Sequence, residues 1–152
     1  MKRKISTKLL LIFLIISSYN LINSCANREE TTPCFPNSNI NVSINTNLPS
    51  YQNLWVVGGW LYLNEQMAGT RGLIIVRTGN NTFKIYDRNA PHICPDQNST
   101  LQVKDNIKII CPKDDAEWIL LTGEPTKVSP KPPKTYHNYY FDANSGILTI
   151  RN

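Results

Sequence analysis

Two short segments of the chain combine proline with side chains that can bind metal ions. The first covers residues 87–96 (DRNAPHICPD), and the second covers residues 111–115 (CPKDD). Imidazole, thiolate and carboxylate groups are the ligands that zinc and iron centres use in proteins. Both segments lie between strand-like runs. This pattern is typical of two loops that close around a bound group.

The rest of the chain has the pattern of short antiparallel strands. Apolar and polar residues alternate over residues 40–44, and residues 78–81 (TGNN) and 144–146 (NSG) have the composition of hairpin turns. No segment keeps a 3.6-residue apolar period for three turns, so we expect little helix. Strands are predicted at residues 40–44, 54–57, 60–63, 73–77, 83–88, 101–103, 107–111, 118–121, 136–142 and 147–151.

These strands predict an all-β domain, built as a sandwich or partial barrel of antiparallel sheets. Aromatic side chains are expected to supply much of the core volume. The candidates are Trp55, Trp60, Trp118, Tyr136, Tyr139, Tyr140 and Phe141.

The first residues have the layout of an export signal. Residues 1–24 contain four basic residues within positions 2–8, namely Lys2, Arg3, Lys4 and Lys8. An eight-residue apolar run follows at positions 9–16, and it is too short to cross a bilayer. Residues 21–25 (LINSC) resemble the lipobox of bacterial lipoproteins, which implies acylation of Cys25. We therefore expect a signal peptide at 1–24, a polar tether at 25–39 and a folded domain at 40–152.

The charge balance changes when the signal is removed. The whole chain has a formal net charge of +5, but four of its 16 Lys and Arg residues and none of its 11 acidic residues lie in the signal. The remainder is nearly neutral, so nucleic acid is not an expected partner. We expect a lipid anchor in the outer membrane of a bacterial envelope, facing the periplasm or the surface.

The order of motifs resembles the Rieske iron-sulfur family, whose two cluster loops carry C-x-H and C-x-x-H. The resemblance covers residues 54–152. It rests on RGLIIVR (71–77), FKIYDR (83–88), APH (90–92), VKDNIKIICP (103–112), TGEP (122–125), PPKTY (132–136) and GILTI (146–150). It implies a Rieske-like fold in which two hairpins present the ligand loops.

In that family two Cys bind one iron of a 2Fe-2S cluster and two His bind the other. The resemblance retains His92 and Cys111 in ligand positions. It places Ala90 where a Cys is needed and Asp114 where a His is needed. A methyl group has no electron pair to donate, so we expect the cluster to be lost and no cofactor to be bound.

Two alternatives to the cluster-free loops, and one disulfide-bonded variant of those loops, remain open. An electron carrier could hold a 2Fe-2S cluster with Cys94 and Asp114 as replacement ligands. A mononuclear zinc site could use His92, Cys94, Cys111 and Asp114, although H-x-C with C-x-x-D is not an established zinc spacing. A disulfide could join Cys94 to Cys111, because an exported chain meets oxidising conditions. That pairing would leave Cys34 free in the tether.

Enzymatic activity is not expected. The chain has no G-x-S-x-G elbow, no H-E-x-x-H and no phosphate-binding glycine loop. The sequence thus predicts an anchored envelope protein with a binding or structural role and an unknown protein partner.

Overall fold

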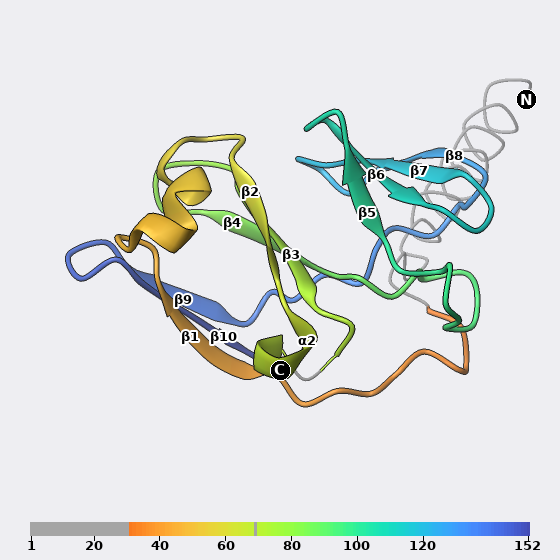
Figure 1. Ribbon diagram of the computed structural model, residues 1–152, viewed down its shortest axis with the longest axis horizontal. Coiled ribbons are helices and arrows are strands. Elements are labelled where there is room, and N and C mark those ends of the chain that lie inside the picture. Colours follow the sequence, from red (N-terminus) through yellow and green to blue (C-terminus); the bar gives the residue numbers. More distant parts are fainter. Residues whose placement is uncertain (1–30, 69) are drawn as a thin grey trace, which may run out of the picture.

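The computed structural model describes residues 31–68 and 70–152, which form a mostly β domain (Figure 1). Two short helical segments lie in this part of the chain: the 3-10 helix η1 (Pro49–Trp55) and the one-turn helix α2 (Glu65–Ala68). The strands are β1 (Asn41–Asn45), β2 (Trp60–Leu63), β3 (Leu73–Arg77), β4 (Phe83–Asp87), β5 (Gln102–Lys104), β6 (Lys108–Cys111), β7 (Ala116–Ile119), β8 (Pro125–Lys127), β9 (Tyr139–Asp142) and β10 (Ile147–Arg151).

These strands pair into three small antiparallel sheets, with orders β1-β10-β9, β2-β3-β4 and β5-β6-β7-β8. The mostly β, antiparallel character predicted from the sequence is therefore confirmed. No sheet in the described part of the chain closes into a barrel. Of the two segments that the sequence singles out, the first runs from the end of β4 toward β5, and the second joins β6 to β7.

The sheet β2-β3-β4 has a core on each of its faces, and Figure 1 shows it between the other two sheets. Successive residues of a strand point to opposite faces. Leu73 and Ile75 therefore pack in one core, with side chains from β1 and β10. Ile74 and Val76 pack in the other core, with side chains from β6 and β7. Burial on both faces explains why β3 has an unbroken apolar sequence.

The strand predicted at residues 54–57 is not formed. Instead, η1 continues to Trp55, and a turn follows in which the Gly59 amide donates to the Val56 carbonyl at 3.0 Å. Pro49 lies at the start of η1, where its fixed φ favours a helical turn. A short apolar run does not distinguish helix from strand. Helix α2 and strand β8, which lies in a proline-rich connector, were also not predicted.

The aromatic core is smaller than predicted. Trp118 and Tyr136 are buried, but Trp55 is 54% exposed and Tyr140 is 68% exposed. Tyr139 and Tyr140 are neighbours in β9, so only one of them can face the core. Tyr139 takes that position, where its hydroxyl accepts a hydrogen bond from the Phe83 amide at 3.0 Å. The prediction that Trp55 and Tyr140 lie in the core is wrong.

Candidate functional site

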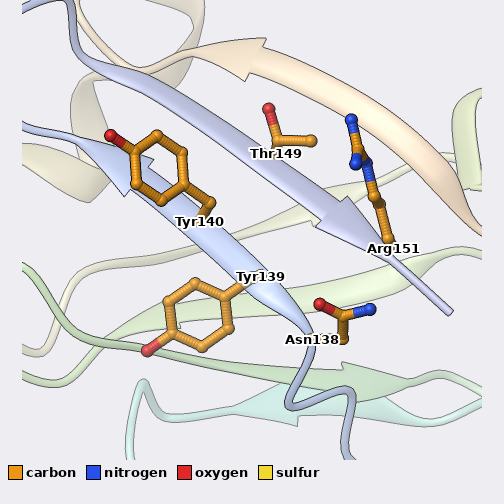
Figure 2. A pocket seen from close by; sticks show the side chains of 5 residues that line it. All are labelled: Asn138, Tyr139, Tyr140, Thr149 and Arg151. Carbon is orange, nitrogen blue, oxygen red and sulfur yellow. The ribbon is translucent and has the colours of Figure 1, made fainter.

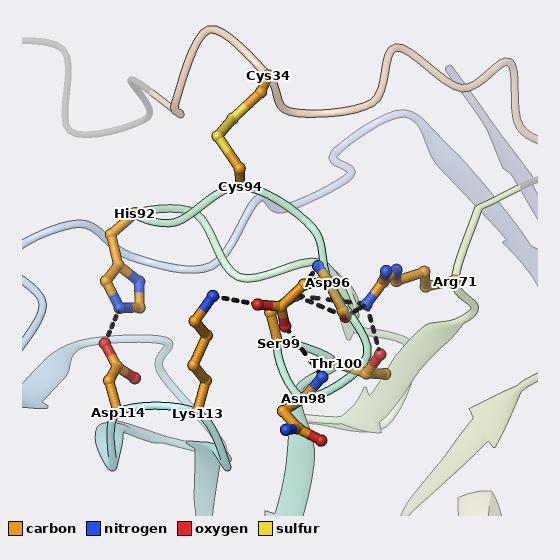
Figure 3. A network of polar contacts seen from close by, with 10 residues as sticks. All are labelled: Cys34, Arg71, His92, Cys94, Asp96, Asn98, Ser99, Thr100, Lys113 and Asp114. Carbon is orange, nitrogen blue, oxygen red and sulfur yellow. Dashed lines mark hydrogen bonds and ion pairs between the residues drawn. A yellow bond between two sulfur atoms is a disulfide. The ribbon is translucent and has the colours of Figure 1, made fainter.

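The structure brings the two sequence-predicted loops into contact. Residues 88–101 connect β4 to β5, and residues 112–115 form the turn between β6 and β7. His92 in the first loop lies 2.5 Å from Asp114 in the second, measured from Nε2 to Oδ2 (Figure 3). The His92 ring also lies against the indole of Trp118, with 5.6 Å between ring centroids. The loops are thus joined by a direct side-chain contact.

Asp114 forms several of the contacts that close this end of the sheet. Its Oδ1 accepts a hydrogen bond from the Ala116 amide at 3.2 Å, which fixes the turn. Desolvation alone would raise the pKa of Asp114, but hydrogen bonds from His92 and Cys111 outweigh it. The pKa of Asp114 is therefore lowered, and the carboxylate is stabilised in its charged form.

Cys111 is a fully buried thiol in β6. Burial raises the pKa of its thiol to about 11, and the neighbouring Asp114 carboxylate also disfavours the thiolate. Only a thiolate is a good nucleophile and metal ligand. Cys111 is therefore protonated near neutral pH and behaves as a small apolar core residue.

Cys94 forms a disulfide with Cys34, with 5.5 Å between the two Cα atoms. The predicted pairing of Cys94 with Cys111 is wrong, and so is the expectation that Cys34 is free. The physical reason lies in the register of β6 and the path of the tether. Strand alternation places the Cys111 side chain on the buried face. The tether meanwhile runs beside the first loop, where the Thr32 amide donates to the Pro91 carbonyl at 3.0 Å.

The remaining sequence-predicted position, Ala90, is fully buried in the core that contains Trp118 and Cys111. Its methyl group contributes to packing, and it offers no ligand atom.

A second set of polar contacts links the loops on the side of Asp96. Figure 3 shows the Lys113 ammonium paired with the Asp96 carboxylate, which joins the second loop to the first. Arg71 donates to the Asp96 carbonyl and to the Thr100 hydroxyl, the latter at 2.9 Å. These contacts attach the first loop to the segment that precedes β3. The loop conformation is thus fixed from both sides.

The base of the first loop contains a buried acid that sequence reasoning did not assign. The carboxylate of Asp87 accepts hydrogen bonds from the Tyr136 hydroxyl at 2.7 Å, from the Asn89 amide at 2.8 Å and from the Thr70 hydroxyl at 3.1 Å. Burial, together with Asp87, raises the pKa of Tyr136. The available signal was an acid at the end of an apolar strand, with Asn two residues later.

The donor atoms present do not fit a 2Fe-2S cluster. His92 Nδ1 is buried and has no hydrogen-bond partner among the described residues, so one imidazole nitrogen is unpaired. However, Ala90 offers no donor, Cys94 is bound in a disulfide, and Asp114 is bonded to His92 itself. Residues 31–68 and 70–152 contain no group of three or more His, Cys, Asp or Glu side chains arranged to hold a metal ion.

One further surface feature is relevant to the binding of a small molecule. A small hollow of about 230 Å³ lies beside β9 and β10, lined by Asn138, Tyr139, Tyr140, Thr149 and Arg151 (Figure 2). Its volume is below the roughly 300 Å³ at which small-molecule sites begin.

The predicted acylation site, Cys25, and the predicted signal lie outside the described residues. No helix in the described part of the chain is long and apolar enough to cross a membrane.

No protein-family model, curated protein or solved structure matches this chain.

Proposed function

We propose that this chain is a lipid-anchored envelope protein with a Rieske-like domain whose paired loops hold no cluster, and that its role is binding or structural. Anchorage through acylated Cys25 would place the domain at the outer membrane. The tether from Cys25 to Cys34 would then be short, because Cys34 is joined to the first loop. In this proposal the protein performs neither catalysis nor electron transfer.

One observation carries the proposal: the retained imidazole of His92 is bonded at 2.5 Å to Asp114, which stands where the second histidine is required. Asp114, the replacement ligand in the second loop, is thus engaged by His92, and only Nδ1 of that imidazole is left unpaired. The disulfide of Cys94 supports the same conclusion because it removes the replacement thiolate, and burial keeps the Cys111 thiol protonated by raising its pKa to about 11.

The first test is the metal and thiol content of the full-length chain, purified in mild detergent under aerobic and anaerobic conditions. We expect no visible charge-transfer absorption and neither iron nor zinc. Denaturation without reductant should expose one free thiol, that of Cys111, if Cys25 is acylated. A coloured protein with a two-iron cluster would favour the electron carrier instead. Stoichiometric zinc with reduced thiols would favour the mononuclear site.

The second test addresses the Rieske-like architecture itself. The double variant Ala90→Cys with Asp114→His restores the full set of two thiolates and two imidazoles. If the loops keep the family geometry, anaerobic reconstitution with iron and sulfide should give this variant the absorption of a 2Fe-2S cluster. The single variant Asp114→His, which still lacks one thiolate, is the matched control and should stay colourless. A folded but colourless double variant would count against the Rieske-like architecture.

A further inference from the structure

An open groove of about 670 Å³ lies between the end of η1 and the turn that joins β5 to β6. Its apolar lining comes from the segment 55–60, which contributes Trp55, Val56, Val57 and Trp60. Its polar lining residues are Gln52, Asn53 and Asn106, each of which has an amide side chain. We call this feature the indole groove. Its volume is within the range of roughly 300–1,000 Å³ that is usual for small-molecule sites.

Both indoles of the groove are held in place by internal hydrogen bonds. Trp55 Nε1 donates to the Thr46 carbonyl at 2.6 Å, and Trp60 Nε1 donates to Asn106 Oδ1 at 2.9 Å. Since both N–H groups are already used, the indoles can offer a ligand only their ring faces and edges. Trp55 nevertheless remains 54% exposed. A large aromatic side chain that is both fixed and exposed loses little conformational entropy when it binds a ligand.

The backbone beneath the groove is also fixed. The Gly58 amide donates to the Arg77 carbonyl at 2.8 Å, and the Arg77 amide donates to the Gly59 carbonyl at 2.9 Å. A Cβ added at Gly59 would lie 1.7 Å from the Asn53 carbonyl oxygen, so only glycine allows this close approach. The Arg77 guanidinium holds the Leu54 carbonyl at 2.9 Å, directly before Trp55. The groove is therefore formed before any ligand arrives.

The lining of the groove limits the chemistry of its ligand. None of the residues that line it is charged, so an ionic ligand would lose hydration without gaining an ion pair there. A purely apolar ligand would cover the amides of Gln52 and Asn53 and leave them unpaired, which costs about 1–3 kcal/mol for each buried group. A neutral ligand with both apolar faces and hydroxyl groups satisfies both conditions.

We infer that the indole groove binds a neutral oligosaccharide. The apolar C–H face of a pyranose ring would lie against the indole of Trp55, and its hydroxyl groups would pair with the amides of Gln52 and Asn53. This inference rests on the proposed binding role and names the class of ligand. Exposed aromatic side chains with a polar rim are common at binding surfaces.

The test is a titration of the full-length chain, in mild detergent, with neutral oligosaccharides built from glucose or N-acetylglucosamine. Tryptophan fluorescence is the readout, since two of the three tryptophans line the groove. Uronic-acid oligomers and a neutral apolar peptide are titrated in parallel. We expect a saturable change with at least one neutral oligosaccharide and none with the other two ligands.

The variant Trp55→Ala should weaken that binding at least ten-fold, and Trp55→Phe should weaken it less. Tyr140→Ala is the matched control, because Tyr140 is an exposed aromatic residue outside the groove. Gln52→Ala changes an exposed groove residue and keeps the test valid if Trp55→Ala does not fold. For Gln52→Ala, isothermal titration calorimetry should show a several-fold loss of affinity.

The inference is overturned if no neutral oligosaccharide binds at millimolar concentration. It is also overturned if the charged oligomer or the peptide binds as well, or if Trp55→Ala and Tyr140→Ala behave alike. The metal analysis separates these outcomes from the proposed function. A colourless, metal-free protein that binds no sugar contradicts only the inference about the groove, whereas an iron-containing protein contradicts the proposed function.

Discussion

The paired loops and the indole groove differ in how their side chains are used. In the loops, ionisable and metal-binding side chains are bonded to one another. His92 contacts Asp114, Cys94 is joined to Cys34, and Lys113 is paired with Asp96. In the groove, internal bonds fix the edges of Trp55 and Trp60 while apolar and amide groups remain open to solvent. The paired loops therefore contain reactive residue types whose side chains already have internal partners. The indole groove instead exposes apolar residue types that are usual for a core.

The comparison of the two regions shows that residue type alone does not locate a binding surface. A functional group is available to a ligand only when the fold leaves it exposed and without an internal partner. We expect substitutions in the loops to change mainly stability, and substitutions in the groove to change mainly binding. The following experiments test that division, beginning with the largest expected effect.

Removal of the disulfide should have the largest effect on stability. The Cys34–Cys94 bond closes a loop with a sequence separation of 60 residues, and loop-closure entropy predicts a loss of about 4 kcal/mol when it is absent. The double variant Cys34→Ala with Cys94→Ala should show this loss in urea unfolding. Reductant should destabilise the wild type to a similar extent and leave the double variant unchanged. A wild type that is insensitive to reductant would contradict the prediction.

Loss of the buried carboxylate of Asp87 should have the next largest effect. Asp87→Ala leaves the Tyr136 hydroxyl and the Asn89 amide buried without an acceptor, which should cost roughly 3 kcal/mol. Asp87→Asn keeps one acceptor oxygen in the same place, so its loss should be clearly smaller. Urea unfolding of both variants checks the order. Equal losses would indicate that shape, rather than hydrogen bonding, matters at this position.

Asp114 should contribute to the stability of the folded state in a pH-dependent way. Its pKa in the folded state is below the value of about 3.9 for an unfolded aspartate. The contribution is thus fully present above pH ~4 and is lost as pH falls through the folded-state pKa. In thermal melts at a series of pH values below 4, Asp114→Asn should lose stability less steeply than the wild type. Identical slopes would contradict the role of the His92–Asp114 contact.

Substitution in the groove should have the smallest effect on stability. Val57 is 58% exposed, so Val57→Ser should change the free energy of unfolding by about 0.5 kcal/mol or less. The matched core substitution Val76→Ser should be far more costly, because Val76 is fully buried. Chemical denaturation compares the two. A large loss at Val57 would mean that the groove lining supports the core and is not free for a ligand.

Much of the fold follows from local patterns. Alternation at residues 40–44 and the turn residues at 144–146 predicted β1 and the hairpin of β9 and β10, because period-two burial and glycine-containing turns are local properties. The apolar run at residues 73–77 predicted the strand β3. Residues 54–57 were assigned wrongly, since a short apolar run also suits the end of a 3-10 helix.

The candidate site was less predictable. The residues of the two loops were identified from their types, but the partner of Cys94 was not, because Cys34 is 60 residues away and belongs to a segment that reads as a tether. The indole groove was missed for a related reason. Two tryptophans near two valines are typical of a core, and only the packing of η1 against the sheets shows which of their faces stays exposed.

Local residue patterns alone predicted the antiparallel β character and showed that positions 90 and 114 carry an alanine and an aspartate. Both depend on the properties of individual residues and their near neighbours. Long-range packing was needed to establish that Cys34 is bonded to Cys94, that Asp114 contacts His92, and that Trp55 faces solvent. These outcomes depend on contacts between segments far apart in the chain, and burial and bond formation at such contacts are properties of the whole fold.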